Sequence, residues 1–188
     1  MNLVSLGKRY GTDKVYHGYL PYYEQWFSSI RNNPLSLCEI GIGWKGRSLS
    51  MWHDFFPLAS IYGIDNSAAH TLIKDRVQCF VGEQQDSAFL ATVIEETGPL
   101  DIVIDDGSHH ADDQIASFEC LWPAVHSGGW YCIEDYSLTL RRFNQNQYGI
   151  LDLLSRKCTK IMLGRSPYAE MHLIGQGRKS GLIALRKR

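Results

Sequence analysis

Residues 35–48 read LSLCEIGIGWKGRS and join a short apolar run to a glycine-rich turn. The run ends at Ile40, Gly41 and Gly43 follow it, and residues 48–56 have apolar side chains at helical spacing. Glycine lets a backbone turn tightly and approach a ligand closely, and the N–H groups at a helix start favour anionic or polar ligand groups. The stretch therefore predicts a strand, a nucleotide-type cofactor loop and a helix, with a purely structural glycine turn as the alternative.

The same alternation of strand and helix signals continues along the chain. Short apolar runs, bounded by Gly, Pro, Asp or Asn, lie near 35–40, 60–65, 77–81, 100–105 and 129–134. Stretches with helical spacing lie at 19–30, 48–56, 68–74, 86–97 and 112–125. Such unalternating runs are typical of strands buried on both faces of a parallel sheet, so we expect an α/β layered fold. After the fifth strand, QYGILDLLSRK indicates a helix, KIML a strand, and MHLI with GLIALRK a closing hairpin.

The composition is that of one globular domain. The chain has 188 residues, 44% apolar and 21% charged, and its 19 Lys and Arg against 20 Asp and Glu leave a net charge of -1. That balance gives no basic field of the kind that attracts nucleic acid or anionic membranes. The five cysteines form no CxxC pair and lie mostly in apolar runs, which indicates reduced core thiols. No segment approaches the roughly 18 apolar residues of a membrane helix, and no signal-peptide pattern is present, so we expect a cytoplasmic protein.

Polar residues at the ends of the second and third strands fit a nucleotide cofactor. Asp65 ends the second strand, where a carboxylate can accept hydrogen bonds from both hydroxyls of a ribose. Residues 82–86, GEQQD, lie where an adenine edge would fall, and Asp86 is alternatively the N-cap of the next helix. The loop fits NAD as well as S-adenosylmethionine. Glu39 favours the second cofactor, because its carboxylate can orient the glycine loop or meet the amino group of an amino-acid cofactor.

Acidic residues follow the fourth and fifth strands. Residues 105–110 are DDGSHH, and Glu134 and Asp135 follow the fifth apolar run. Because ligands in open α/β sheets bind outside the carboxyl ends of the strands, we expect the two loops to face one crevice. Converging carboxylates repel one another unless they share protons or bind a cation, which predicts Mg²⁺ or, alternatively, Mn²⁺ or Ca²⁺. His109 follows a carboxylate by three residues and is predicted to be functional, and a transition-metal site that uses both histidines is an alternative.

These segments resemble a known family. The chain resembles class I S-adenosylmethionine-dependent methyltransferases. The stretches that carry the resemblance are YGTDK at 10–14, EIGIG at 39–43, YGID at 62–65, DIVIDDGSHH at 101–110 and GGWYCIEDY at 128–136. Within that class, the similarity is to the Mg-dependent sugar O-methyltransferases of macrolide, tetracenomycin-type and related natural-product pathways. A more distant resemblance, to the cephalosporin-hydroxylase-like group, shares the metal carboxylates. The resemblance implies a Rossmann-like, doubly wound, mostly parallel seven-stranded sheet with a C-terminal antiparallel hairpin and helices on both faces.

The resemblance also implies a role for each matching position. The metal ligands would be Asp106, Glu134 and Asp135, and the general base would be His109. The residues that line the cofactor would be Thr12, Glu39, Gly41, Gly43, Ser48, Asp65 and Gln84. The chain would form a single domain, 1–188, in which an N-terminal helical segment, 1–34, folds over the cofactor beside a Rossmann-like core, 35–188.

The expected activity is transfer of a methyl group from S-adenosylmethionine to a hydroxyl of a vicinal diol in a sugar or glycosylated small molecule, assisted by Mg²⁺. A catechol fits the same chelation, with Trp44, Trp130 or Tyr136 as an apolar clamp. The alternatives are an NAD(P)-dependent oxidoreductase and a non-catalytic module that binds a nucleotide or a metal. We expect a small-molecule substrate and neither nucleic acid nor a membrane as partner, and the sequence leaves a homo-oligomer open. The segment YSLTLRRFNQNQYG at 136–149 departs from the family, so substrate identity does not transfer.

Overall fold

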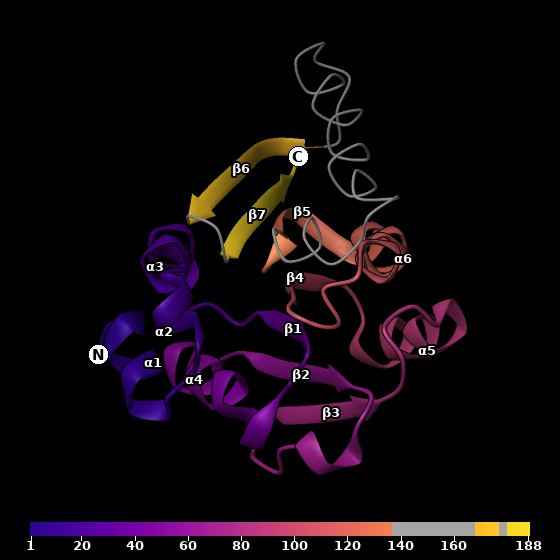
Figure 1. Ribbon diagram of the computed structural model, residues 1–188, viewed down its shortest axis with the longest axis horizontal. Helices are drawn as coiled ribbons and strands as arrows, with labels where there is room; N and C mark the ends of the chain where they lie inside the picture. Colours follow the sequence, from indigo (N-terminus) through magenta and orange to yellow (C-terminus); the bar gives the residue numbers. More distant parts are fainter. Residues whose placement is uncertain (137–167, 177–179) are drawn as a thin grey trace.

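A seven-stranded sheet forms the centre of the protein (Figure 1). The structure is a computed structural model and describes residues 1–136, 168–176 and 180–188. The strands are β1 (Ser36–Ile40), β2 (Ser60–Asp65), β3 (Val77–Val81), β4 (Leu100–Asp105), β5 (Val125–Ile133), β6 (Tyr168–Gln176) and β7 (Ser180–Lys187). Their order across the sheet is β3-β2-β1-β4-β5-β7-β6; β1 to β5 are parallel, and β7 is antiparallel to both of its neighbours. The predicted mostly parallel sheet with a C-terminal antiparallel hairpin is confirmed.

Strand β5 differs most from its predicted bounds. It begins at Val125 rather than near residue 129, and its pairing with β4 shifts register between Leu100 and Ile102. Gly128 lies in this irregular part with a φ of 81°, a backbone conformation that favours glycine. Residues 126–128 are exposed, so the apolar pattern marked only the buried second half of the strand.

The described residues form six α-helices. They are α1 (Leu3–Tyr10), α2 (Lys14–His17), α3 (Leu20–Phe27), α4 (Arg47–Phe55), α5 (Ser87–Thr97) and α6 (Ala111–Leu121). Short 3₁₀ turns lie at Ser28–Ile30, Trp44–Gly46, Ala68–His70 and Trp122–Ala124. The Asp86 carboxylate accepts hydrogen bonds from the N–H groups of Ala88 and Phe89, which confirms it as the N-cap of α5. Among all the residues that the structure describes, no helix has both the length and the apolar character needed to cross a membrane.

The helix predicted at 68–74 is wrong. A single 3₁₀ turn ends at His70, and Thr71 is already extended. Leu72 packs against the core, whereas Ile73 is 99% exposed. Because only one large apolar side chain anchors the segment, it cannot bury the face from which a short helix gains its stability.

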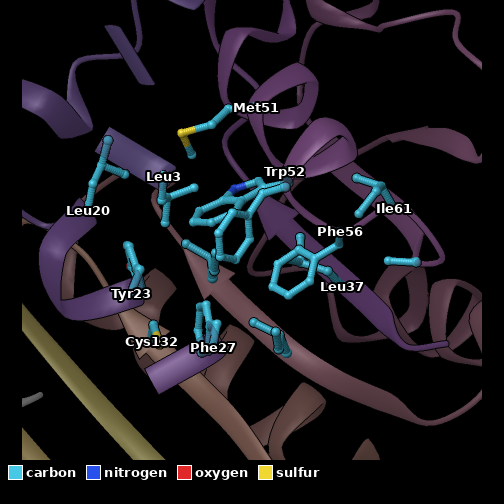
Figure 2. Packing of buried hydrophobic residues seen from close by; sticks show 14 of the residues in the cluster. Leu3, Leu20, Tyr23, Phe27, Leu37, Met51, Trp52, Phe56, Ile61 and Cys132 are labelled. Atoms are coloured by element: carbon cyan, nitrogen blue, oxygen red, sulfur yellow. The ribbon is translucent and has the colours of Figure 1, made fainter. Parts of the chain in front are cut away.

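Apolar side chains pack against both faces of the sheet, and Figure 1 shows α1 to α4 on one side and α5 and α6 on the other. Phe27 of α3 and Trp52 of α4 pack with Leu37 of β1 on the first face (Figure 2). Phe118 of α6 belongs to the second cluster, together with Cys38, the residue that follows Leu37 in β1. Coverage of both faces explains why the strand sequences are apolar without alternation.

The cysteines of the described residues are free thiols. They are Cys38, Cys79, Cys120 and Cys132. Burial raises the pKa of the Cys38 thiol to about 12, which makes it unreactive at neutral pH. Cys158, the predicted helix QYGILDLLSRK and the predicted strand KIML lie outside the described residues.

Candidate functional site

A pocket of about 440 Å³ opens at the carboxyl ends of the parallel strands, where open α/β sheets bind their ligands. Its walls come from the residues that follow β1 to β5 and from residues 11–13 of the N-terminal segment. The predicted site residues that line it are Thr12, Gly41, Gly43, Ser48, Asp65, Gln84, Asp106, His109 and Asp135. Two predicted site residues, Glu39 and Glu134, are buried behind this wall, with exposed fractions of 0% and 1%.

The glycine loop after β1 forms one wall through its backbone. A Cβ atom at Gly41 would lie 2.1 Å from the backbone oxygen of Asp106, and the φ of Gly41 is 87°. A Cβ atom at Gly43 would meet no atom within 4 Å, although its φ of 61° also favours glycine. The first glycine therefore allows β1 and β4 to approach closely, whereas the second leaves open space beside the pocket.

Asp65 is held in place at the end of β2. Its Oδ2 accepts a hydrogen bond from the Gly43 N–H at 3.2 Å, and its Oδ1 accepts one from the Ser67 N–H at 2.9 Å. The His70 Nδ1 also lies 2.9 Å from Oδ1. The carboxylate is thus oriented by its own loop and by the glycine loop, in the position predicted for a ribose contact.

Gln84 connects the loops that follow β3 and β4. Its Oε1 accepts a hydrogen bond from the Ser108 N–H at 2.6 Å, and its Nε2 donates to Asp105 Oδ1 at 3.3 Å. Asp105 is fully buried and also accepts a hydrogen bond from the Ser117 hydroxyl at 2.5 Å. Burial raises the pKa of Asp105 to about 6. Asp105 is one of the four acidic residues at the carboxyl ends of β4 and β5, and its hydrogen bonds hold the neighbouring segments in place.

Two carboxylates and an imidazole converge at the other end of the pocket. One ligand atom from each of Asp106, His109 and Asp135 lies within 4.8 Å of the other two. His109 and Asp135 have φ values of 57° and 54°, in the left-handed region that non-glycine residues rarely adopt. Such backbone conformations cost about 1–3 kcal/mol each and cluster at functional sites. His110, the other candidate histidine, is exposed and does not line the pocket.

Lys14 is a central residue that the sequence reasoning missed. Its side chain is 1% exposed, and its ammonium lies 2.6 Å from Asp106 Oδ2, 3.0 Å from Glu39 Oε1 and 3.0 Å from Glu134 Oε1. Burial alone would lower the pKa of Lys14, but the carboxylates of Asp106, Glu134 and Glu39 raise it well above its usual value. The signal available in the sequence was the YGTDK segment, in which only Thr12 was singled out.

The two buried glutamates act on the pocket through other residues. Glu39 Oε2 accepts a hydrogen bond from the Ser48 hydroxyl at 2.6 Å, so this carboxylate orients the start of α4. Glu134 Oε1 accepts a hydrogen bond from the Tyr23 hydroxyl at 2.7 Å and contacts Lys14. Burial and the neighbouring carboxylate of Asp106 raise the pKa of Glu134 well above its usual value. The structure therefore places Glu134 beside Asp106, outside the group that converges in the pocket.

Only one of the three candidate clamp aromatics lies at the pocket. Trp44 lines it and is 66% exposed. Trp130 is buried and stacks on Trp26 with ring centroids 5.3 Å apart, and Tyr136 is buried against Gly181.

No protein-family model matches the chain, but comparisons of sequence and of structure find relatives. The 8-demethyl-8-(2-methoxy-alpha-L-rhamnosyl)-tetracenomycin-C 3'-O-methyltransferase of Streptomyces olivaceus is 44% identical over 142 residues, which are 71% of this chain and 36% of that protein. The demethylmacrocin O-methyltransferase of Streptomyces fradiae is 36% identical and aligns with 93% of this chain and 50% of its own length. A solved structure of the MycE methyltransferase from the mycinamycin biosynthetic pathway, in complex with Mg, SAH and mycinamycin VI, has a TM-score of 0.86 at 32% identity; the match covers 100% of this chain and 55% of that one. The chain belongs to the methyltransferases and is related to their Mg-dependent sugar O-methyltransferases.

The chain spans only part of its relatives' length, from 36% of the tetracenomycin enzyme to 55% of MycE. More distant structures share the fold alone. A putative ribosomal RNA methyltransferase from Plasmodium falciparum, for example, has a TM-score of 0.65 at 12% identity.

The pocket of the present chain fits both a divalent cation and a nucleoside cofactor. Asp106 and Asp135 offer carboxylate oxygens at one end, the donors that hard divalent cations prefer, and a ligand atom of His109 lies within 4.8 Å of theirs. The open space beside Gly43 and the oriented carboxylate of Asp65 lie in the same pocket and offer what a nucleoside requires. The two ligand types would therefore lie next to each other.

Proposed function

We propose that this chain forms the S-adenosylmethionine- and metal-binding part of an O-methyltransferase that acts on a hydroxyl of a vicinal diol in a sugar of a glycosylated small molecule. One observation carries the proposal: a single pocket contains both the glycine loop with the carboxylate of Asp65 and the cluster of two aspartates and His109. The tetracenomycin relative supports the substrate class, because its name gives a rhamnosyl group and 3'-O-methyl transfer.

The cofactor would bind along the glycine loop. Gly41 and Gly43 would give it backbone contacts, and Asp65 would accept hydrogen bonds from the ribose hydroxyls. Thr12, Ser48 and Gln84, which line the same pocket, would complete its surroundings, and Glu39 would act through Ser48.

The metal would be held by Asp106 and Asp135, with Glu134 as the third predicted carboxylate. A divalent cation at this position would supply positive charge that favours the ionised form of a neighbouring hydroxyl. His109 would accept the proton of the reacting hydroxyl, since the imidazole lines the pocket beside both aspartates. The acidic cluster would also orient the diol, so that one oxygen faces the methyl group of the cofactor.

The same proposal includes the organisation and location expected from the sequence. Residues 1–34 would cover one side of the pocket and residues 35–188 would form the core of a single domain, with residues 11–13 supplying part of the pocket wall. The free thiols among the described residues support a cytoplasmic location.

Methyl transfer from isotope-labelled S-adenosylmethionine to rhamnosylated and other glycosylated acceptors tests the proposal directly. We expect transfer in the presence of Mg²⁺, loss of transfer after EDTA, and loss in the Asp106→Ala variant. Asp112→Ala is the matched control, because Asp112 is an exposed carboxylate in the first turn of α6. Binding of the cofactor without transfer to any diol would favour the non-catalytic alternative, and binding of NAD⁺ instead would favour the oxidoreductase.

A further inference from the structure

We propose that Lys14, Tyr19 and Tyr23 are positioning residues that orient the three carboxylates of the metal site from the N-terminal segment. The inference rests on the proposed function, because it assigns the partners of the metal ligands. It makes the first helices of the chain part of the site rather than a cover over the cofactor alone.

Each predicted metal ligand contacts at least one of these three residues, and Glu134 contacts both Tyr23 and Lys14. The Lys14 ammonium lies 2.6 Å from Asp106 Oδ2, and the Tyr23 hydroxyl donates to Glu134 Oε1 at 2.7 Å. For the third ligand, Asp135, the hydroxyl of Tyr19 donates to Oδ1 at 2.5 Å.

The three partners are buried, so solvent does not compete for these contacts. Their exposed fractions are 1% for Lys14 and 0% for both tyrosines. Tyr19 and Tyr23 are four residues apart at the start of α3, and this spacing places two side chains on one face of a helix. The Tyr23 ring is fixed in turn by packing on Phe27, with centroids 5.4 Å apart. The positions of the donors are thus set by the hydrophobic core.

Holding one oxygen of a carboxylate fixes the direction of the other. Asp106 and Asp135 line the pocket while one oxygen of each is bonded on the buried side, so the bonds determine how these carboxylates face the pocket. Residues that orient metal ligands in this way typically contribute about 10–100-fold to metal affinity. Lys14 additionally offsets part of the repulsion among Asp106, Glu134 and Glu39.

An opposite role for Lys14 is a competing cation that occupies the place of the metal. The ammonium would then reduce metal affinity, and its removal would strengthen binding. The tyrosine hydroxyls carry no charge and cannot compete in this way. Variants of all three residues therefore distinguish orientation of the carboxylates from competition between Lys14 and the metal.

The experiment is titration of the full chain with Mn²⁺, followed by electron paramagnetic resonance of the free ion, for the wild type and for Lys14→Met, Tyr19→Phe and Tyr23→Phe. We expect each variant to bind Mn²⁺ about 10–100-fold more weakly than the wild type. Lys8→Met and Tyr16→Phe are matched controls in the same segment, since Lys8 is exposed and Tyr16 is 90% exposed, and we expect both to retain wild-type affinity.

Thermal unfolding of each variant separates a local effect from loss of the fold. If Lys14→Met does not fold, the two tyrosine variants, which remove a single oxygen each, decide the question. Wild-type affinity in folded Tyr19→Phe and Tyr23→Phe, or tighter binding in Lys14→Met, would overturn the inference while leaving the proposed function intact. Absence of Mn²⁺ binding in the wild type would instead overturn the metal site itself, and the inference with it.

Discussion

The two ends of the pocket are built in different ways. The end proposed to bind the cofactor, called the cofactor end below, has one wall of glycine-loop backbone, with Gly41 and Gly43 in conformations that favour glycine. The acidic end is formed by side chains, and its carboxylates are held by residues of the N-terminal segment. Substitutions in the glycine loop should therefore act through steric fit, and substitutions at the acidic end through charge, proton transfer and hydrogen bonding.

The largest effect is expected at the acidic end. His109→Ala removes the imidazole that faces Asp106 and Asp135, so methyl transfer should fall by about 10²–10⁴-fold, the usual contribution of a general base. Affinity for S-adenosylmethionine should remain, because the glycine loop is untouched. Rate measurements with labelled cofactor, together with calorimetric binding, check both parts. A variant that keeps its turnover would remove His109 from the role of base.

The next largest effect is expected at the backbone of the cofactor end. Gly41→Ala would place a Cβ atom 2.1 Å from the backbone oxygen of Asp106, at a φ of 87°. The positive φ and the overpacking together should lower the free energy of unfolding by about 2–4 kcal/mol. Urea denaturation measures this change. An unfolding midpoint equal to that of the wild type would show that β1 and β4 do not need the close approach seen in the structure.

A smaller change is expected at Asp65, the carboxylate proposed to bind the ribose hydroxyls. Asp65→Asn preserves the size of the side chain but removes its charge, so contacts to two hydroxyls should lose about 1.5–3 kcal/mol. The affinity for S-adenosylmethionine should fall by about 10–100-fold, with little effect on Mn²⁺ binding at the other end of the pocket. Parallel titrations with S-adenosylmethionine and with Mn²⁺ measure the two affinities. An equal loss of affinity for both ligands would contradict the assignment of the two ligands to different ends of the pocket.

The smallest effect is expected from Gly43→Ala. A Cβ atom at this position meets nothing within 4 Å, so only the positive φ opposes it, at a cost of about 1 kcal/mol in stability. Comparison with Gly41→Ala in the same denaturation experiment isolates the steric part of the larger change. If the two alanine variants are equally destabilised, the close approach to Asp106 contributes nothing.

The sequence predicted the fold well where the signal is local. The five parallel strands are short apolar runs with clear carboxyl ends, and the glycine loop and Asp65 lie at two of those ends. The helix at 68–74 failed because Ile73, an apolar residue, faces solvent. Periodicity cannot distinguish such a residue from one that is buried.

The acidic end could be predicted only in part, because its partners are distant in the sequence. Asp106 and Asp135 were found from their place after strands β4 and β5. Lys14 lies 92 positions before Asp106, and Tyr19 lies 116 positions before Asp135. A lysine and a tyrosine in an amphipathic segment carry no local sign of such contacts. Sequence reasoning therefore assigned the carboxylates without the residues that orient them.

Calorimetric titration with S-adenosylmethionine and with NAD⁺, each with Mg²⁺ and after EDTA, measures whether one pocket binds a methyl donor beside a divalent cation. We expect that S-adenosylmethionine binds, that NAD⁺ does not, and that a separate Mg²⁺ titration gives a binding isotherm which Asp106→Ala abolishes. Binding of NAD⁺ alone, or a Mg²⁺ isotherm unchanged by Asp106→Ala, would contradict this expectation.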